Sequence, residues 1–426
     1  MSLVLILVFL GLLIVGVPVA IALGGSSLLM VMAEGNSPHL VVVHRMIAGV
    51  DSFPLLAIPF FIMAGSLMNS GGITARIYDF ALALVGWLKG GLGHVNVVGS
   101  VIFAGMSGTA VADAGGLGNI EIKAMRDHGY DVDFAVGITG ASSTIGPIIP
   151  PSLPMVIYGV MANASIGQLF AAGLIPGLLM AATMMGMVAW YAHVRGFHRD
   201  ATFALGRLWF TFRRAFLPLM TPVLLIGGMT TGVFTPTEAA IAATAYAMVL
   251  GLFVYRTLTW RGLIKVSMET VETTAIILLI VAGASIFGYL ITITKITDNV
   301  ADLVLSITSE PWQVLLLVNI FLLIVGCFME TIAAITILVP VLLPLMEKIG
   351  VDPVHFGLIM VLNLMIGLLT PPVGMVLYIL ARVANISFER ATRACAPFLI
   401  PLLITLGLVT YWPEMVLWLP TVFYRS

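Results

Sequence analysis

The chain has 426 residues, of which 60% are apolar and only 9% are charged. Because a soluble globular domain carries about 25% charged residues, this composition excludes a water-exposed fold and predicts a chain embedded in lipid. The 19 basic and 20 acidic side chains nearly balance, which gives no sign of nucleic-acid binding. The two cysteines, Cys327 and Cys395, lack metal-ligand or redox spacing, so we expect small buried side chains.

Apolar stretches long enough to cross a bilayer recur along the chain, since a spanning helix needs about 20 apolar residues. The first has no basic segment before it and exceeds the core of a signal peptide, so we expect a retained span. Spans are predicted at 3–33, 53–70, 133–163, 167–192, 215–233, 237–256, 271–293, 354–385 and 394–420. Those at 133–163 and 354–385 carry central prolines and glycines, which predicts two half-helices in each.

Two further stretches, 95–121 and 314–346, are predicted to be re-entrant hairpins. As a single helix, 314–346 would be about 50 Å long, against a hydrocarbon core of about 30 Å. A hairpin resolves this mismatch, with Glu330-Thr331 at its tip, and Ser107-Gly108-Thr109 is the corresponding tip of the first. The segments 75–92 and 298–312 mix charged and apolar residues, which predicts amphipathic helices on the membrane surface.

The sequence contains an internal repeat with a constant offset of 221 residues (371 − 150 = 221). The offset superimposes helix-breaking positions without a gap: Gly105 on Gly326, Gly129 on Gly350, Asp131 on Asp352, Gly146 on Gly367, Pro150-Pro151 on Pro371-Pro372, and Pro176 on Pro397. Matched breaks of this kind predict a duplicated membrane protein with two inverted repeats.

Basic residues gather in two connectors, at 195–214 and 256–265. The spans 215–233 and 237–256 form a hairpin between them, so both connectors lie on one side, which the positive-inside rule makes cytoplasmic. The turn at 235–238 is then outside. With inverted repeats, we expect the N-terminus inside and the C-terminus outside.

The two interrupted helices are the predicted centre of function. An interruption frees backbone N–H groups at one half-helix start, which suit a carboxylate, and carbonyls at the other end, which suit a small cation. Together with the hairpin tips, this predicts two sodium sites, one in each repeat, with an anionic solute between them and no other cofactor. The predicted solute region comprises Asp113, Ser143, Thr144, Pro151, Ser152, Pro371 and Gly374.

These side chains also have structural interpretations. Serine and threonine in membrane helices often bond to a carbonyl one turn back, and glycines beside prolines often serve close packing. Asp113 and Glu330 are stronger indications, because a carboxylate inside a membrane is costly. For Asp113 the alternative is a hairpin end that faces water.

One motif favours an enzyme. Gly105-Met106-Ser107-Gly108 fits the GxSG of rhomboid-type intramembrane serine proteases, whose serine needs a general base. All seven histidines, however, lie in connectors or near span ends. No HExxH, Walker A loop or dinucleotide fingerprint is present. We therefore predict a transporter that is no enzyme and is not itself powered by ATP; a receptor or scaffold would not need matched helix breaks.

Several long motifs resemble one family. They are FPLLAIPFFIMAGSLMNSGG at 53–72, MSGTAVADAGGLGNIEIKAM at 106–125, STIGPIIPPSLP at 143–154, TPTEAA at 235–240 and TPPVG at 370–374. Across essentially its whole length, the chain resembles the large membrane subunit of tripartite ATP-independent periplasmic (TRAP) transporters.

This resemblance implies sodium-driven import of an organic acid across a bacterial or archaeal inner membrane. It implies two partners: a small membrane subunit of about four spans and a periplasmic solute-binding protein. The implied fold is similar to that of divalent-anion/sodium symporters, with an elevator motion. The implied sodium-site residues are Ser107, Gly108, Thr109, Gly146, Pro147 and Pro150 in the first repeat, and Gly326, Glu330, Thr331, Thr370 and Pro372 in the second.

The domain assignment follows from that fold. Residues 93–192 and 311–426 are expected to form the moving transport domain, and 1–92 and 193–310 the scaffold. The surface helices 75–92 and 298–312 would be the arms that join them. A stand-alone sodium/carboxylate symporter of the same architecture remains the alternative, and no residue pattern names the carboxylate.

Overall fold

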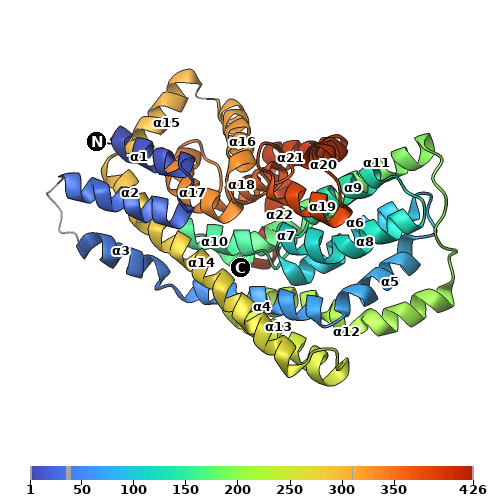
Figure 1. Ribbon diagram of the computed structural model, residues 1–426. Helices are drawn as coiled ribbons and strands as arrows, with labels where there is room; N and C mark the ends of the chain where they lie inside the picture. Colours follow the sequence, from blue (N-terminus) through green and yellow to red (C-terminus); the bar gives the residue numbers. More distant parts are fainter. Residues whose placement is uncertain (1, 35–39, 309, 425–426) are drawn as a thin grey trace.

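The computed structural model describes residues 2–34, 40–308 and 310–424, and the elements of this part of the chain are helices (Figure 1). Eight helical segments within these ranges are long and apolar enough to cross a membrane. The all-α polytopic membrane fold predicted from composition is therefore confirmed.

The helices fall into two series that follow one another along the chain. The first comprises α1 (Ser2–Ile14), α2 (Val19–Glu34), α3 (Leu40–Val50), η1 (Phe53–Leu56), α4 (Ala57–Ser70), α5 (Ile73–Val85), α6 (Gly91–Ser107), α7 (Ala110–Ala112), the π-helix η2 (Asp113–Leu117), α8 (Gly118–Asp127), α9 (Val132–Ser143), α10 (Leu153–Met161) and α11 (Ile166–Val194).

The second series comprises α12 (Leu205–Thr230), α13 (Pro236–Val249), the π-helix η3 (Leu250–Val254), α14 (Trp260–Ile293), α15 (Ile296–Ile307), α16 (Pro311–Phe328), α17 (Thr331–Lys348), α18 (Pro353–Gly367), α19 (Met375–Ala384), α20 (Phe388–Cys395), η4 (Ala396–Phe398), α21 (Leu399–Tyr411) and α22 (Pro413–Tyr424).

The prediction of one span at 3–33 is wrong. The segment is two helices, α1 and α2, which pack against each other (Figure 1). Between them Gly16 has a φ of +88°, a left-handed conformation that ends α1, and Pro18 precedes the first turn of α2. A proline at a helix start loses no internal hydrogen bond, so the chain restarts there instead of continuing.

The last predicted span, 394–420, is also divided. Helix α21 ends at Tyr411, because Trp412 leaves the helical conformation with a φ of −128° and a ψ of 71°, and α22 starts at Pro413. Helices α12 and α14 begin well before the predicted spans, because their first turns carry charged residues that hydropathy alone rejects. Helix α3 has no counterpart among the predicted elements.

The two hairpins and the two broken helices form where the sequence predicts them. The hairpin of repeat 1 consists of α6 and the α7–η2–α8 arm, and that of repeat 2 consists of α16 and α17. The broken helices are α9–α10 and α18–α19. The offset also holds in conformation: Gly129 and Gly350 both have φ of +80°, and Asp131 and Asp352 both cap the helix that follows.

Contacts at their ends show that the broken helices run in opposite directions. At the start of α9, Asp133 pairs with Arg390 of α20, just after α19 has ended. At the other end, the hydroxyl of Tyr158 in α10 donates to the carbonyl of Pro353, where α18 begins, at 2.6 Å. The first broken helix therefore ends where the second begins, so the repeats are inverted.

Both ends of each hairpin lie at one end of the molecule, as re-entrant hairpins require. The start of α6 is held by a backbone bond from Gly90 to His198, and the start of α9 is held by the Asp131–Arg195 ion pair. Both partners belong to the connector 195–204, which we call the basic end. The second hairpin starts and ends near residues 409–411, through bonds of Trp312 and His355.

Helices of the two repeats pack crosswise. Helix α2 packs on α14 and α4 packs on α13, and the offset relates these two pairs to each other. Similarly, α10 packs on α17 and α19 packs on η2 and α8. In Figure 1 the long helix α14, which has 34 residues, runs diagonally past α2, α3 and α4. The repeats thus exchange equivalent contacts about a pseudo-two-fold axis.

Candidate functional site

The tip of the first hairpin is a sharp reversal between α6 and α7. Gly108 has a φ of +63°, so α6 ends at Ser107 with a left-handed residue that favours glycine. Thr109 then caps the next arm, because its hydroxyl accepts the N–H of Ala112 at 3.2 Å. The predicted tip residues therefore lie at the reversal itself.

This tip contacts the interruption of the first broken helix, residues 144–152. The N–H of Leu153 donates to the carbonyl of Gly108 at 3.4 Å. A Cβ on Gly146 would lie 3.4 Å from the Thr109 carbonyl oxygen, so the interruption packs against the backbone of the tip. Ser152 closes the segment by bonding to the carbonyl of Pro147 and capping α10.

The tip of the second hairpin is built differently. Met329 is extended, and the carboxylate of Glu330 caps α17 by accepting the N–H groups of Ile332 at 2.9 Å and Ala333 at 3.1 Å. Glu330 thus stands where Thr109 stands in the first repeat, and it places a negative charge against the positive end of α17. Thr331 is the first residue of that helix and is buried.

The second tip contacts the interruption of the second broken helix in turn. Gly326 lies against Gly367, and the N–H of Val373 donates to the carbonyl of Cys327 at 3.2 Å. Gly374 has a φ of +53° and starts α19. In both repeats, therefore, the hairpin tip meets the interruption of its own repeat, and the peptide bonds Pro150-Pro151 and Pro371-Pro372 at the two interruptions are both cis.

The two halves also meet each other. A Cβ on Gly140 of α9 would lie 3.2 Å from a methyl group of Leu369, within the second interruption. A Cβ on Gly115 of η2 would lie 3.7 Å from a methyl group of Ile379 in α19. The structure therefore gathers the predicted regions of both repeats into one part of the molecule.

The two interruptions differ in exposure. Residues 143–152 are all buried, whereas Pro371, Pro372 and Val373 are exposed. The difference follows from packing, because α10 lies on α17, α4 and η1, while the loop before α19 has no such cover. Access to the site is therefore unequal in the two repeats.

Several predicted hydroxyl groups bond to carbonyls one turn back. Ser143 bonds to Gly140 at 2.8 Å, Thr144 to Ala141 at 2.6 Å and Thr370 to Ile366 at 3.0 Å. This is the structural interpretation considered above. A hydroxyl that donates keeps lone pairs for a cation, so these contacts are compatible with ligation.

Asp113 is buried, with 1% of its surface exposed, and it belongs to η2 inside the hairpin. The expected alternative of a water-facing hairpin end is therefore wrong. The hydroxyl of Ser107, in the GxSG motif, has no hydrogen-bond partner among the residues that the structure describes. Of the histidines, His355 bonds to the carbonyl of Val409, at the far end of the hairpin from the second tip.

Each repeat also contains a buried network of polar side chains that the sequence analysis does not predict. In the first, the Ser142 hydroxyl donates to the Asn96 carbonyl oxygen at 2.6 Å. In the second, the Asn363 amide donates to the Asn319 carbonyl oxygen at 2.6 Å. The 221-residue offset relates Ser142 to Asn363, and this match is the signal that could have found them. Each network fixes the broken helix to the first arm of its hairpin.

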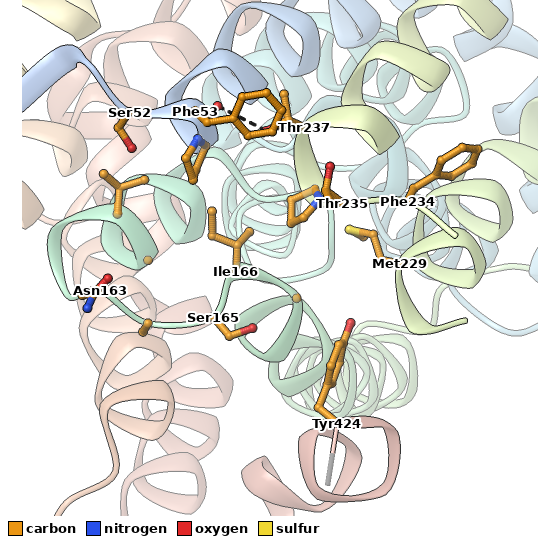
Figure 2. A pocket seen from close by; sticks show the side chains of 16 residues that line it. Ser52, Phe53, Asn163, Ser165, Ile166, Met229, Phe234, Thr235, Thr237 and Tyr424 are labelled. Atoms are coloured by element: carbon orange, nitrogen blue, oxygen red, sulfur yellow. Dashed lines mark hydrogen bonds between the residues drawn. The ribbon is translucent and has the colours of Figure 1, made fainter. Parts of the chain in front are cut away.

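A cavity of about 450 Å³ lies at the start of α11, the opposite end of this helix from the one that leads into the basic end. Figure 2 shows its lining. Figure 2 shows Ser165 and Ile166, at the start of α11, on one side and Thr235 on the other, with Tyr424 below. Among the described residues, its lining contains no Lys, Arg, Asp or Glu. The cavity separates elements of the two predicted domains.

Comparison with known proteins places these features in a family. Residues 6–415 match the family described as the tripartite ATP-independent periplasmic transporter, DctM component. The chain is 48% identical, over 97% of both chains, to the sialic acid TRAP transporter large permease protein SiaM of Vibrio cholerae. It is 43% identical to the sialic acid TRAP transporter permease protein SiaT of Haemophilus influenzae, over 97% of this chain and 67% of the relative.

A more distant relative is the 2,3-diketo-L-gulonate TRAP transporter large permease protein YiaN of Escherichia coli, at 37% identity over 97% of this chain and 98% of the relative. The fold is similar to the crystal structure of the YdaH transporter of Alcanivorax borkumensis, with a TM-score of 0.63 at 14% identity over 88% of this chain and 87% of that one. The chain therefore belongs to the DctM family and is a large permease component of a tripartite ATP-independent periplasmic transporter.

Proposed function

We propose that this permease imports an organic acid by coupling its movement to sodium, with a transport domain that moves as an elevator against a scaffold. One observation carries the proposal: in each of two inverted repeats, a hairpin tip contacts the interruption of its own broken helix. Inverted repeats with broken helices at their interface are the architecture of secondary transporters.

The helix ends at the interruptions suit both kinds of ion. Helices α6, α9, α16 and α18 end there, and their last carbonyls carry partial negative charge toward a cation. The arms that start at Ala110, Leu153, Thr331 and Met375 present N–H groups with partial positive charge, which suit a carboxylate. We propose one sodium site per repeat, formed by the tip and the interruption, with the solute between them.

The names of relatives support an acidic solute. Similar permeases are named for sialic acid, 2,3-diketo-L-gulonate and isethionate, all of which are organic anions. The two relatives named for sialic acid are 48% and 43% identical to this chain. We therefore propose a sugar acid of the sialic-acid type as the first substrate to test.

The cavity of Figure 2 supports relative motion of two domains. Its lining comes from 52–54 and 229–237 of the proposed scaffold, and from 159–167 of the proposed transport domain. A space between such parts changes shape when one slides past the other. In the same scheme, α5 and α15 are the arms that connect them.

The partners follow from the family. A tripartite system implies a small membrane subunit and a periplasmic binding protein beside the large permease. We propose that this chain works with both in a bacterial inner membrane. The stand-alone symporter is then the competing hypothesis, because it would need neither partner.

The experiment is uptake of radiolabelled sialic acid into proteoliposomes, with and without an inward sodium gradient. Uptake is expected only when the small subunit is reconstituted with this chain and the binding protein is added outside. Potassium in place of sodium is the ion control. Uptake by this chain alone would establish the stand-alone symporter, and uptake unaffected by sodium would refute the coupling.

A further inference from the structure

The interior of the first hairpin holds two acidic side chains, Asp113 and Glu121, on the arm that packs against α6. Each has 1% of its surface exposed. No ion pair among the described residues reaches either carboxyl group. Two carboxylates in a membrane interior without a basic partner are costly, so the structure must compensate for their charge.

Glu121 is partly compensated by neutral groups. One of its oxygens accepts the Asn96 amide of α6 at 2.6 Å, and the same amide also reaches Thr139 at 2.7 Å. The other oxygen has no hydrogen-bond partner within residues 2–34, 40–308 and 310–424, and it faces Gly99, where a Cβ would approach it to 2.9 Å. Glu121 is therefore held in place with one acceptor oxygen unused.

Asp113 has no such support. Neither of its side-chain oxygens has a hydrogen-bond partner among the described residues. The hydroxyl of Ser100 lies beside this carboxyl group without forming a bond of good geometry, and it too is fully buried and has no partner in the same part of the chain. The two carboxyl oxygens of Asp113 and the hydroxyl oxygen of Ser100 therefore lie together without partners, and the charge of Glu121 acts on Asp113.

The backbone at this position is unusual as well. Asp113 is the first residue of the π-helix η2, which replaces one α-helical turn between α7 and α8. Single π-helical turns are rare and occur frequently at functional sites. Ser100, the neighbour of Asp113 on α6, lies one helical turn beyond Asn96.

We propose that the first hairpin binds a sodium ion between the Asp113 carboxylate and the Ser100 hydroxyl, in the field of the Glu121 carboxylate. Hard oxygen ligands suit an alkali or alkaline-earth cation. The two ligating groups, one carboxylate and one neutral hydroxyl, carry a single negative charge, and the Glu121 carboxylate adds to the field without touching the ion. This ion is additional to those proposed at the two tips.

The inference concerns ion coupling, so it rests on the proposed function, but the ion can be counted without transport. The experiment measures binding of a radioactive sodium tracer to the purified chain with its small subunit. Asp113→Asn is expected to remove about one sodium ion per chain. Ser100→Ala is expected to raise the sodium concentration at half saturation about threefold to tenfold.

Asp127→Asn is the matched control, since Asp127 is exposed at the end of α8 in the same hairpin and should leave the count unchanged. Size-exclusion chromatography shows whether Asp113→Asn folds. If it does not, Ser100→Ala still tests the inference. Wild-type sodium binding in Ser100→Ala, or in a folded Asp113→Asn, overturns the inference. The inference is also overturned if Asp113→Asn leaves the sodium count unchanged and the wild-type chain releases a proton when it is titrated without sodium. The site then holds a proton and not a sodium ion.

Thr370→Ala distinguishes the sodium sites proposed at the tips from the ion proposed inside the first hairpin. If Thr370→Ala keeps the full count while Asp113→Asn loses one ion, the tip assignment fails and the hairpin ion stands. If Thr370→Ala loses an ion and Asp113→Asn does not, the hairpin ion is refuted and the tip assignment survives.

Discussion

Gly326 of α16 and Gly367 of α18 pack backbone to backbone, so closely that a methyl group on Gly367 would lie 2.7 Å from the Gly326 carbonyl oxygen. This contact joins the second hairpin to the second broken helix at the point where the helix is interrupted. The fixed 221-residue offset relates the two glycines to Gly105 and Gly146 of the first repeat, where Gly105 instead faces Pro222 of α12.

Gly367→Ala is therefore expected to push the hairpin from the interruption. Overpacking a tight contact costs about 1–3 kcal/mol, and the displaced tip should lower sodium-driven uptake more than it lowers the amount of folded protein. Uptake normalised to folded protein measures this. Gly407→Ala in α21, where nothing lies within 4 Å of the added methyl group, is the control and should behave as wild type.

The hydroxyl groups at the interruptions give a second prediction. Thr370→Ala removes a proposed sodium ligand and is expected to raise the sodium concentration for half-maximal uptake several-fold, with less effect on melting temperature. Thr292→Ala removes a similar back-bonded hydroxyl on the exposed face of α14 and should change neither. Thr370→Ser should restore the wild-type response, and a wild-type response in Thr370→Ala would reject Thr370 as a ligand.

Thr109 needs its own control, because its hydroxyl also caps α7. Thr109→Ala is expected to cost about 1 kcal/mol of stability through the lost cap and, in addition, to weaken sodium dependence. Thr109→Asn keeps a capping side chain but moves the oxygen. Normal sodium dependence in a destabilised Thr109→Ala would assign this residue a capping role alone.

The Asn319–Asn363 pair allows a test of how firmly the second broken helix is fixed to its hairpin. A double-mutant cycle with Asn319→Leu and Asn363→Leu is expected to give a coupling of about 1 kcal/mol, within the range for hydrogen bonds between membrane helices. Chemical unfolding in detergent would measure it. Strictly additive effects would mean that the 2.6 Å bond contributes nothing to this joint.

The direction of the repeats predicts which residues are reached from each side of the membrane. In a chain with Cys327 and Cys395 replaced by alanine, Ser165→Cys should react with a membrane-impermeant maleimide from outside the cell. His198→Cys, at the basic end, should react only after the membrane is opened. Both positions are exposed, so accessibility to water alone does not separate them. Equal labelling of the two in intact cells would contradict the orientation.

Relative motion can be tested at the cavity of Figure 2. Thr235→Cys lies in the lining, and attaching adducts of increasing size is expected to slow uptake progressively if the cavity must close during transport. Thr231→Cys, exposed on the same connection but outside the lining, is the control. Size-independent uptake after full modification of Thr235→Cys would argue against closure at this place.

Sequence patterns predict the breaks well because helix interruption is a local property. Proline removes a donor and glycine permits left-handed backbone, so the turns at Gly108, Gly129 and Gly350 and the proline pairs can be placed from residues nearby. The caps at Asp131 and Asp352 are equally local. This explains why the hairpins and broken helices are found with nearly the right ends.

Other features depend on distant partners. Gly16 and Pro18 are visible in the sequence, but only the packing of α1 against α2 shows that the chain turns back there. Glu121 lies in a segment predicted as part of a hairpin arm, yet its partner Asn96 is 25 residues away on the other arm. The roles of individual predicted sodium ligands remain predictions, since they depend on the ion itself.

The crosswise packing of α2 on α14 and of α4 on α13 has a consequence for the origin of the protein. Each half covers its apolar faces with the other half, so a single half could not fold stably in isolation. From this packing we infer that, before duplication, an ancestral short chain paired with a second copy of itself. Because the partners ran oppositely, that ancestor inserted in both orientations, and fusion of the two genes later fixed one orientation for each half.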